Sequence, residues 1–419
     1  MGYLYNVLIY LAAPFAVLVQ LWRGLRDPSY RERVGERFGF GPPIAGPTIW
    51  IHAVSVGEVQ AAQPLVAQIR RRHPRYKLVL TTVTPTGAAR ARLLFGDLVE
   101  LRYVPLDLPG SVKRFFDRVQ PRLAMILETE LWPNLYAECG RRGIPLVLAS
   151  ARVSPRSVGK YRRLVPLFRK TLSHGIVIAA QSETDAERFK SIGATPERTH
   201  VTGNIKFDFQ PPPGIEAQGL DWREQNAPGR PIWVAGSTHE GEEAIVLDAH
   251  RIVLDRFPDA LLVLVPRHPQ RFDSVRDLLA KRNDRSANRS SRAAISPRTS
   301  VLLGDTMGEL MMFYAASDVA FVAGSLIPIG GHNLLEPASV GRPVLTGPHN
   351  FNSEEIVQLL MEARAAFIVR DTEQLAHAVS GLLATGELRN VMGAAGKAVL
   401  DANRGALDRL LTLVDPLLE

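Results

Sequence analysis

Short apolar runs of strand length alternate with amphipathic stretches of helix length between residues 48 and 369, and this alternation restricts the folds open to the chain. The first series of predicted strands is Thr48–His52, Lys77–Thr82, Val99–Val104, Leu123–Leu127, Leu146–Ser150, Ile176–Ala180 and His200–Thr202. The second series is Ile232–Ala235, Leu261–Val265, Val301–Leu303, Val319–Val322, Val344–Leu345 and Phe367–Val369. Strands that alternate with helices form parallel sheets covered on both faces. We therefore predict an α/β fold with two doubly wound, Rossmann-like domains and a cleft between them.

A proline-rich stretch interrupts the alternation and is interpreted as a domain boundary. Pro211–Gly214 reads PPPG and is followed by polar sequence, so residues 211–229 are predicted to form a linker. Residues 23–210 and 230–392 then form the two domains, and residues 393–419 a C-terminal helical segment. Residues 282–298 are basic and of low complexity, which predicts a mobile surface insertion with at most one short strand.

The run Tyr3–Trp22 departs from a globular pattern because it contains no charged residue. About 20 helical residues extend ~30 Å, enough to cross the core of a bilayer. No basic residue precedes the run, and four arginines lie within residues 23–33. This asymmetry predicts a membrane anchor at residues 1–22 with the main body in the cytoplasm. Asn6, Pro14 and Gln20 weaken a spanning segment, so a helix lying in the membrane plane remains an alternative.

The net charge of +8 favours an anionic partner, such as an anionic lipid or a phosphorylated substrate. No dense basic run interleaved with aromatic residues occurs, which argues against nucleic acid. The single cysteine, Cys139, excludes an intramolecular disulfide and a cysteine-based metal site, and suits a reducing compartment.

The segment Thr48–Glu58, TIWIHAVSVGE, places a carboxylate where a strand passes into a helix. Ser55 and Gly57 are predicted to form a tight turn, and Glu58 to open the helix. In open α/β sheets, ligands bind outside this edge of the strands. A carboxylate there can accept a proton from a substrate hydroxyl. The residues alone leave open the alternative that Glu58 only interacts with the positive end of its helix dipole.

Several motifs of nucleotide and metal chemistry are missing from the sequence. No Walker A loop and no His-Glu-x-x-His motif occur, and Gly39-Phe40-Gly41 follows no predicted strand. No Asp-x-Asp pair is available to hold a metal–nucleotide complex. We therefore expect a reaction that needs no metal ion and no cofactor.

Two segments of the second domain suit a phosphate group. Pro266 and Arg267 follow a predicted strand, and an arginine there can bind a phosphate with two hydrogen bonds, although a surface ion pair is the alternative. Met307, Gly308 and Glu309 lie at a strand-to-helix junction, where backbone amides can meet an anion. The alternative is that Asp305 or Thr306 merely caps the helix.

Two further turns of the second domain carry polar side chains. Gly330-Gly331 allows a ligand to approach the backbone closely. Asn333 and Glu336 follow, and the Glu336 carboxylate can accept hydrogen bonds from two ribose hydroxyls. Ser237 and Glu240 have the spacing of a capping box, although the same turn could hold a donor carboxylate or phosphate. No metal-ligand spacing links the four histidines in these motifs, so hydrogen-bonding roles are expected for His52, His239, His268 and His332.

An acid and a base of the first domain are also candidates. Glu128 ends the predicted strand Leu123–Leu127, and Lys206 lies near the predicted domain junction. On residue type alone they could form an ion pair that holds a hinge. Arg152 and the basic residues within 156–163 are candidates for binding lipid phosphates, although a solvated basic face explains them equally well.

Eight ordered motifs resemble those of a known family. They are HAVSVGE at 52–58, TPTGAARA at 84–91, ETELWPN at 128–134, GNIKFD at 203–208, STHEGEE at 237–243, PRHP at 266–269, GDTMGEL at 304–310 and GGHNLLEPA at 330–338. This set resembles the Kdo transferases of Gram-negative bacteria, which move 3-deoxy-D-manno-octulosonic acid (Kdo) from its CMP ester to the lipid A precursor. The resemblance runs from about Tyr30 to the C-terminus.

The resemblance implies an inverting glycosyltransferase of GT-B architecture at the cytoplasmic face of the inner membrane. In that architecture the first domain binds the acceptor, the second binds CMP-Kdo, and the C-terminal helix crosses back to the first domain. By resemblance, Glu58 is the general base, and Glu128 and Lys206 stabilise the transition state. The CMP-binding residues carried over are Pro266, Arg267, Met307, Gly308, Glu309, Asn333, Leu334, Leu335 and Glu336.

Two alternatives remain at this stage. One is a GT-B enzyme for another nucleotide sugar, such as a UDP-sugar transferase or epimerase. The other is a membrane-tethered nucleotide-binding protein that has lost catalysis. The joint presence of Glu58, Glu128 and Lys206 argues against the second alternative.

Overall fold

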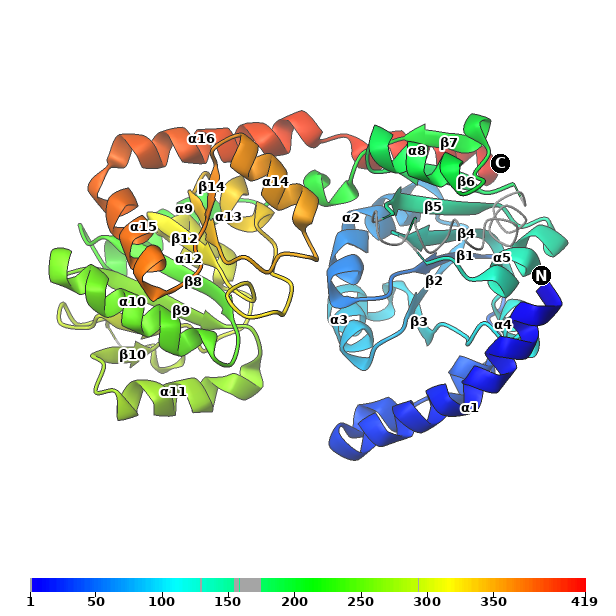
Figure 1. The fold of residues 1–419 in the computed structure, drawn as a ribbon, viewed down its shortest axis with the longest axis horizontal. Helices are drawn as coiled ribbons and strands as arrows, with labels where there is room; N and C mark the ends of the chain where they lie inside the picture. The colour runs from blue at the N-terminus through cyan, green and yellow to red at the C-terminus, as the bar shows by residue number, and fades with distance from the viewer. Residues whose placement is uncertain (1, 129, 154–157, 159–174, 293) are drawn as a thin grey trace. The chain divides into compact units, whose positions relative to one another are not determined.

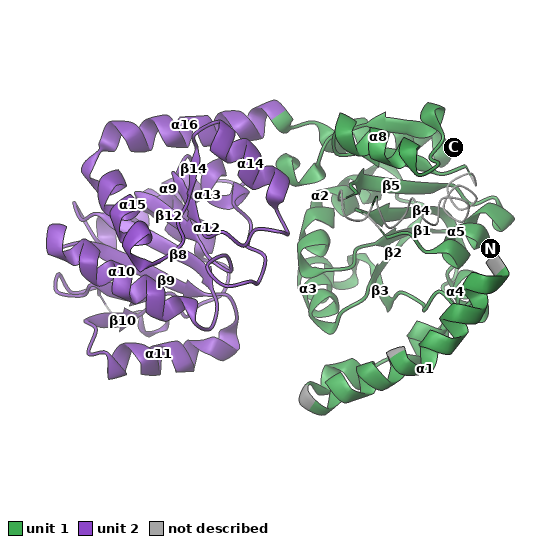
Figure 2. Cartoon of the chain, viewed as in Figure 1, with its two compact units in different colours: residues 1–209, 403–419 green, residues 210–402 purple. Residues whose placement is uncertain are grey.

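The structure is a computed structural model that describes residues 2–128, 130–153, 158, 175–292 and 294–419 (Figure 1). The chain divides into two compact units (Figure 2). Unit 1 comprises residues 1–209 and 403–419, and unit 2 comprises residues 210–402. The basic residues within 156–163, which are candidates for binding lipid phosphates, lie outside the described residues.

Unit 1 is built on a seven-stranded sheet of order β3-β2-β1-β4-β5-β6-β7, in which the pairings between described strands are parallel. Its strands are β1 Thr48–His52, β2 Lys77–Thr82, β3 Glu100–Tyr103, β4 Pro121–Leu127, β5 Leu146–Ala151, β6 Val177–Ala180 and β7 Thr199–Val201. The helices between them are α2 Val56–Arg72, α3 Pro85–Phe95, α4 Pro109–Val119, α5 Pro133–Arg142 and α8 Glu183–Ser191. This is the first of the two doubly wound sheets predicted from the alternation.

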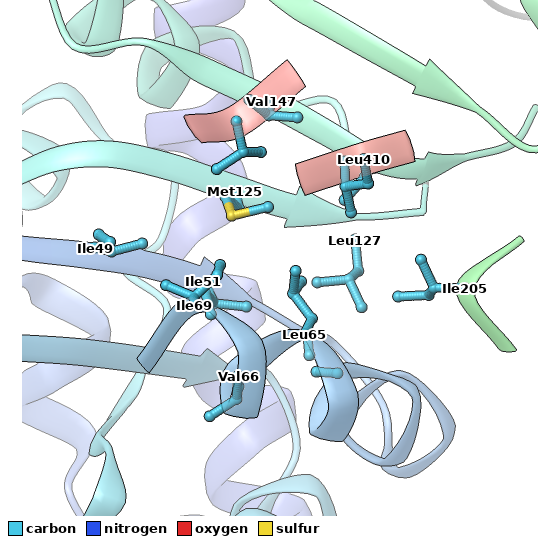
Figure 3. Packing of buried hydrophobic residues seen from close by; sticks show 14 of the residues in the cluster. Ile49, Ile51, Leu65, Val66, Ile69, Met125, Leu127, Val147, Ile205 and Leu410 are labelled. Carbon is cyan, nitrogen blue, oxygen red and sulfur yellow. The ribbon is translucent and has the colours of Figure 1, made fainter. Parts of the chain in front are cut away.

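Successive residues of each strand in this sheet point to opposite faces, so the sheet has two apolar layers. One layer is shown in Figure 3 and joins strand residues to helix α2 and to the C-terminal helix: Ile49, Ile51, Leu65, Val66, Ile69, Met125, Leu127, Val147, Ile205 and Leu410. Trp50, between Ile49 and Ile51 in β1, lies in the other layer, where its ring contacts Phe115 and Phe116 edge-on. Strands buried on both faces explain why β1 and β4 are almost continuously apolar.

The last α-helix of the chain, α17 (Ala406–Val414), packs in unit 1 although residues 210–402 belong to unit 2. The Asp208 carboxylate accepts hydrogen bonds from the backbone amides of Gly405 and Leu407, both at 2.7 Å, and so caps this helix. Arg72 and His73 contact Asp415 at 2.7 and 2.8 Å. The preceding helix, α16 (Gly386–Asn403), is continuous through residue 393, so the predicted boundary at 393 is not where an element begins.

Unit 2 repeats the architecture with a sheet of order β10-β11-β9-β8-β12-β13-β14, also paired in parallel. Its strands are β8 Ile232–Thr238, β9 Leu261–Pro266, β10 Ser286–Asn288, β11 Val301–Leu303, β12 Val319–Val322, β13 Val344–Thr346 and β14 Ala366–Ile368. The helices other than α16 are α9 Ile215–Asn226, α10 Glu242–Arg256, α11 Phe272–Lys281, α12 Leu310–Ala316, α13 Leu335–Ser339, α14 Glu354–Glu362 and α15 Thr372–Ala384.

The linker predicted for residues 211–229 is wrong in most of its length. Residues 215–226 form helix α9, which packs on α12 and belongs to unit 2. A side chain at Gly219 would lie 2.6 Å from the Cβ of Ala315, so the glycine lets the two helices approach closely. The Trp222 ring meets Phe313 edge-on. The polar sequence reflects the exposed side of this helix rather than an irregular connection.

The basic segment at residues 282–298 contains one short strand, in agreement with the prediction of at most one, but its contacts do not suit a mobile insertion. It supplies the edge strand β10, which pairs with β11. The Asp305 carboxylate accepts hydrogen bonds from the amide and hydroxyl of Ser290 at 2.7 and 2.6 Å, and Arg289 pairs with Glu309 at 2.7 Å. Local composition does not reveal these contacts because their partners come from another part of the chain.

The N-terminal helix α1 (Gly2–Arg26) carries an exposed apolar surface. Its segment Tyr3–Leu25 has a mean hydropathy of 1.8 and is long and apolar enough to cross a membrane. Most of the exposed apolar side chains recur at helical spacing, namely Leu4, Val7, Leu8, Leu11, Phe15, Leu18, Trp22 and Leu25, and Tyr3, Tyr10 and Leu21 are exposed beside them. On another side of the helix, the Tyr5 hydroxyl donates a hydrogen bond to Asp107 at 2.7 Å, so this end of α1 lies against the body of unit 1.

Candidate functional site

Glu58 lies in the first turn of α2, directly after the loop that follows β1. Ser55 is the N-cap, and its hydroxyl accepts a hydrogen bond from the Glu58 amide at 3.3 Å. The Glu58 carboxylate in turn accepts hydrogen bonds from the Val54 amide at 2.8 Å and from the Ser55 hydroxyl at 3.0 Å. These reciprocal bonds are a variant of the capping box. They also hold the carboxylate at the C-terminal edge of the sheet.

Burial raises the pKa of the Glu58 carboxyl to about 7. The negative charges of Glu128 and Glu130 act in the same direction, and the hydrogen bonds from Val54 and Ser55 act against it. The positive end of the helix dipole would lower the pKa of Glu58, so burial outweighs that effect here. A carboxyl that titrates near neutral pH is suited to take up and release a proton at that pH.

Glu128 follows β4, the strand next to β1 in the sheet. Its carboxylate accepts a hydrogen bond from the Lys206 ammonium at 2.7 Å. The backbone of Glu128 has φ +58°, a left-handed conformation that non-glycine residues adopt at a cost. This conformation turns the chain sharply at the end of the strand.

The position of Lys206 depends on the end of β5. The Ile205 amide donates to the Ser150 hydroxyl at 3.0 Å, and the Lys206 amide donates to the Asn204 side chain at 3.0 Å. Ser150 also has a left-handed backbone, with φ +50°. The neighbouring strands β1 and β4 therefore end in turns that carry Glu58 and Glu128. The next strand, β5, carries Ser150, which holds the backbone beside Lys206.

Glu130 is a site residue that the sequence analysis did not single out. Burial raises the pKa of its carboxyl, which accepts a hydrogen bond from the Trp132 indole at 2.7 Å. The signal available in the sequence was the Glu-x-Glu spacing at 128 and 130 directly after a strand. Three carboxyl groups thus lie at this edge of the unit 1 sheet, and Lys206 pairs with one of them.

In unit 2, the loops after β8, β9 and β12 carry Arg267 and three histidines. The Arg267 amide donates to the Thr238 carbonyl at 3.0 Å, which joins the ends of β9 and β8. The Arg267 charge lowers the pKa values of His239, His268 and His332, so it lies near all three rings. Arg267 directly follows β9, at the strand end where the sequence predicted it.

The capping box predicted from Ser237 and Glu240 does not form. Ser237 has a left-handed backbone, Gly241 occupies the N-cap of α10, and Glu240 is highly exposed and pairs with Arg271 at 3.3 Å. The buried Glu242 performs the structural role instead. Its carboxylate accepts hydrogen bonds from the amides of His239, Gly324, Ser325 and Leu326 at distances between 2.7 and 3.1 Å. This residue therefore joins the loop after β8 to the loop after β12.

The segment before α12 is held by side-chain contacts. Glu309 pairs with Arg289 and also accepts a hydrogen bond from the Thr306 hydroxyl, so the pKa of its carboxyl is lowered. Gly308 has φ +87°, and Met307 is exposed. Asp305 and Thr306 direct their side chains to Ser290 and Glu309 respectively. The Met307 and Gly308 backbone and the Met307 side chain are the parts accessible to a ligand.

The segment 330–336 turns sharply before α13. Gly330 and Gly331 have φ +111° and +74°, and side chains there would collide with Asn352 and Asn350. The glycines therefore serve close packing within the protein. Asn333 accepts a hydrogen bond from the Leu335 amide at 3.2 Å and donates to Glu336 at 3.3 Å. Leu334 and Leu335 are fully buried, so only their backbones can meet a ligand.

No group of three His, Cys, Asp or Glu side chains in the described part of the chain is arranged to hold a metal ion. The two sheet edges carry carboxylates, the Lys206 ammonium group, Arg267, imidazoles and backbone amides. Unit 1 offers a base near neutral pH, and unit 2 offers donors for anions. These are the groups required for transfer of a sugar from an anionic leaving group.

Two doubly wound parallel sheets with polar groups at their C-terminal edges have the architecture of the GT-B fold. The solved structure of Anabaena Alr3699/HepE in complex with UDP has a TM-score of 0.57 at 15% identity, over 88% of this chain and 99% of that chain. Acinetobacter baumannii MurG has a TM-score of 0.51 at 13% identity, over 86% of this chain and 99% of that chain. These similarities concern the fold.

Sequence comparison defines the family. The family model for 3-deoxy-D-manno-octulosonic-acid transferase (kdotransferase) matches residues 32–209. The 3-deoxy-D-manno-octulosonic acid transferase of Haemophilus influenzae is 44% identical, over 100% of this chain and 99% of that protein. The enzyme of the same description from Bordetella pertussis is 37% identical, over 89% of this chain and 88% of that protein. The chain belongs to the 3-deoxy-D-manno-octulosonic acid (Kdo) transferase family and is a glycosyltransferase.

Proposed function

We propose that this enzyme transfers Kdo from CMP-Kdo to a sugar hydroxyl of the lipid A precursor in lipopolysaccharide biosynthesis, with inversion at the anomeric carbon. The observation that carries the proposal is Glu58, a carboxyl of pKa about 7 that is held by two hydrogen bonds at the C-terminal edge of the unit 1 sheet. Membership of the Kdo transferase family supports the choice of sugar.

In the proposed reaction, the acceptor hydroxyl gives its proton to Glu58 while its oxygen bonds to the anomeric carbon of Kdo. The bond from that carbon to the phosphate oxygen breaks, and CMP leaves with the electron pair. Lys206 is aligned by Glu128 at 2.7 Å and would offset the negative charge that develops in the transition state. The reaction conserves charge and protons without a cofactor.

We assign CMP to unit 2. Arg267 would contact the phosphate, Glu336 and Asn333 the ribose, and the amides of residues 307–309 and 334–335 the remaining polar atoms. Glu309 would act through its backbone, because Arg289 and Thr306 occupy its carboxylate. Pro266 would shape the turn that presents Arg267.

We further propose that the exposed apolar surface of α1 attaches the enzyme to the cytoplasmic face of the inner membrane, where the lipid acceptor resides. The lack of charge along Tyr3–Trp22 and the arginines within residues 23–33 support this orientation.

The decisive experiment is a product assay with purified enzyme, CMP-Kdo and the tetra-acylated lipid A precursor, analysed by mass spectrometry. The product should be heavier than the acceptor by one or more Kdo residues, and CMP should appear in equal number. UDP-sugars offered in place of CMP-Kdo should give no product. Transfer from a UDP-sugar, or CMP release without a new lipid product, would contradict the proposal.

A further inference from the structure

Three histidines of unit 2 come together at the C-terminal edge of its sheet. His239 follows β8, His268 follows β9, and His332 lies in the loop after β12. The strand order β9-β8-β12 makes these loops neighbours. We call His239, His268 and His332 the three-histidine cluster.

The His239 and His332 rings share a hydrogen bond between their Nε2 atoms at 2.8 Å. Their ring planes differ by 5° and their centroids are 5.1 Å apart, so the rings meet end to end rather than face to face. The His268 ring approaches His239 edge-on with a centroid distance of 5.4 Å. An Nε2–Nε2 hydrogen bond requires one proton between the two nitrogens, so one ring donates and the other accepts.

The single proton between the two Nε2 atoms limits how many further protons the His239–His332 pair can bind. When both rings are neutral, the donor ring has an unprotonated Nδ1. A single extra proton can bind there without breaking the shared bond, whereas a second extra proton would leave both Nε2 atoms as donors and break it. The pair is therefore able to gain one positive charge and still keep its geometry.

The charged groups that act on the three rings are cationic. Burial lowers the pKa values of His239 to about 4 and of His332 to about 3, and His268, Arg267 and Arg271 act in the same direction on one or both rings. The acids at the start of α10 are engaged elsewhere. Glu240 and Glu243 contact Arg271 at 3.3 and 3.2 Å, and Glu242 accepts four backbone amides.

The backbone around the pair is also built to hold it. Gly324 has φ +71°, and a side chain there would lie 2.8 Å from the His332 ring and 3.6 Å from the His239 ring. Glu242 binds the amides of both Gly324 and His239. A buried carboxylate thus fixes the two loops whose histidines share the proton.

We propose that the three-histidine cluster and Arg267 form an oxyanion subsite for the donor, and that binding of the anion brings one proton onto the His239–His332 pair. The inference rests on the proposed function, because the anion is taken to be the phosphate of CMP or the carboxylate of the sugar. An incoming negative charge offsets the neighbouring cations and favours the protonated pair, against the effect of burial. The His239–His332 pair is thereby positively charged while the anion is bound, and it releases the proton when CMP leaves.

Calorimetry of CMP binding to the full-length enzyme tests the proposal. Titrations at pH 7.5 in two buffers of different ionisation enthalpy give the number of protons taken up. We expect net uptake by the wild type, and a loss of most of that uptake in His332→Gln and His239→Gln with about tenfold weaker binding. Free CMP has the same ionisation state in every titration, so a difference in proton uptake between variants arises in the complexes. His377→Gln, an exposed histidine of α15, is the matched control and should behave like the wild type.

Two further arms identify the anion. Cytidine lacks the phosphate, so its binding should be unaffected by His332→Gln. If the variants leave CMP binding unchanged but raise the KM for CMP-Kdo about tenfold, the bound oxyanion is the sugar carboxylate and the subsite stands. Absence of proton uptake by the wild type with both CMP and CMP-Kdo would overturn the proposal, as would unchanged CMP affinity and KM in both variants. Failure of the wild type to bind CMP at all would instead contradict the proposed function.

Discussion

Lys206 donates a hydrogen bond to the Glu128 carboxylate at 2.7 Å, although 78 residues separate the two in sequence. The contact joins the end of β4 to the short helical turn at residues 205–208. The Glu128 charge also raises the pKa of Glu58. The ion pair and the candidate base therefore belong to one electrostatic unit, and substitutions in this unit have separable consequences.

Glu58→Gln should abolish most activity while the fold remains. Glutamine keeps the size of the side chain but cannot accept a proton from the acceptor, so turnover should fall by ~10²–10⁴-fold. Loss of part of the cap should cost at most ~1 kcal/mol of unfolding free energy. Turnover with saturating CMP-Kdo and a thermal melting curve on the same preparation check both expectations. A stable variant with near-normal turnover would exclude Glu58 as the base.

The rate should depend on the protonation of Glu58. Its pKa is raised to about 7, so the base is increasingly protonated below that pH and the rate should decrease there. Glu128→Gln removes one negative charge beside it and should shift the acidic limb of the profile to lower pH. The shift should be partial, because burial is the largest cause of the raised pKa. An acidic limb at the same pH in both proteins would mean that another group controls the profile.

Lys206→Ala should separate a catalytic role from a purely structural ion pair. The pair is partly exposed, so its loss should cost at most ~1 kcal/mol of stability. Turnover should nevertheless fall by ~10²-fold or more, because the developing negative charge loses its cation. Lys113→Ala, which removes the exposed contact to Asp117 at 2.8 Å, is the control and should leave turnover unchanged. If Lys206→Ala changed turnover and stability no more than Lys113→Ala, Lys206 and Glu128 would form only a structural ion pair.

Glu336→Ala should weaken CMP binding by ~1–3 kcal/mol, the cost of losing hydrogen bonds to a charged group. Glu336 also receives a hydrogen bond from Asn333, so part of the effect would arise from the freed amide. Glu362→Ala, an exposed acid at the end of α14, should bind CMP like the wild type. Equilibrium binding of CMP measures both variants. Unchanged affinity in Glu336→Ala would place the ribose elsewhere.

Deletion of residues 1–22 should move the enzyme largely to the soluble fraction, because it removes most of the exposed apolar surface of α1. Turnover on detergent-dispersed acceptor should survive. The Asp107 carboxylate keeps its hydrogen bonds from the amides of Asn134 and Leu135 after the deletion. Tyr5→Phe removes only the bond to Asp107 and should leave the enzyme at the membrane. Loss of folding on deletion would show that α1 is part of the core.

Local sequence patterns determined the two sheets and the position of Glu58. Apolar runs bounded by turns located β1, β2, β11 and β12 at their observed limits, and most other strands differed only at their ends. The strand pattern before Ser55 and the helical pattern after it placed Glu58 at a strand-to-helix junction. The helix begins at Val56, however, and so includes Gly57, which was predicted to lie in a turn.

Contacts between distant segments were decided by the tertiary structure. The left-handed backbone of Glu128 and the alignment of Lys206 have no periodic signal, and His239 and His332 are brought together across 93 residues. The composition of residues 211–229 and 282–298 suggested irregular chain, yet Gly219 packs α9 on α12 and Asp305 binds Ser290. Periodicity reports which face of an element is buried, whereas strand order and long-range hydrogen bonds determine which side chains meet at the edge of the sheet.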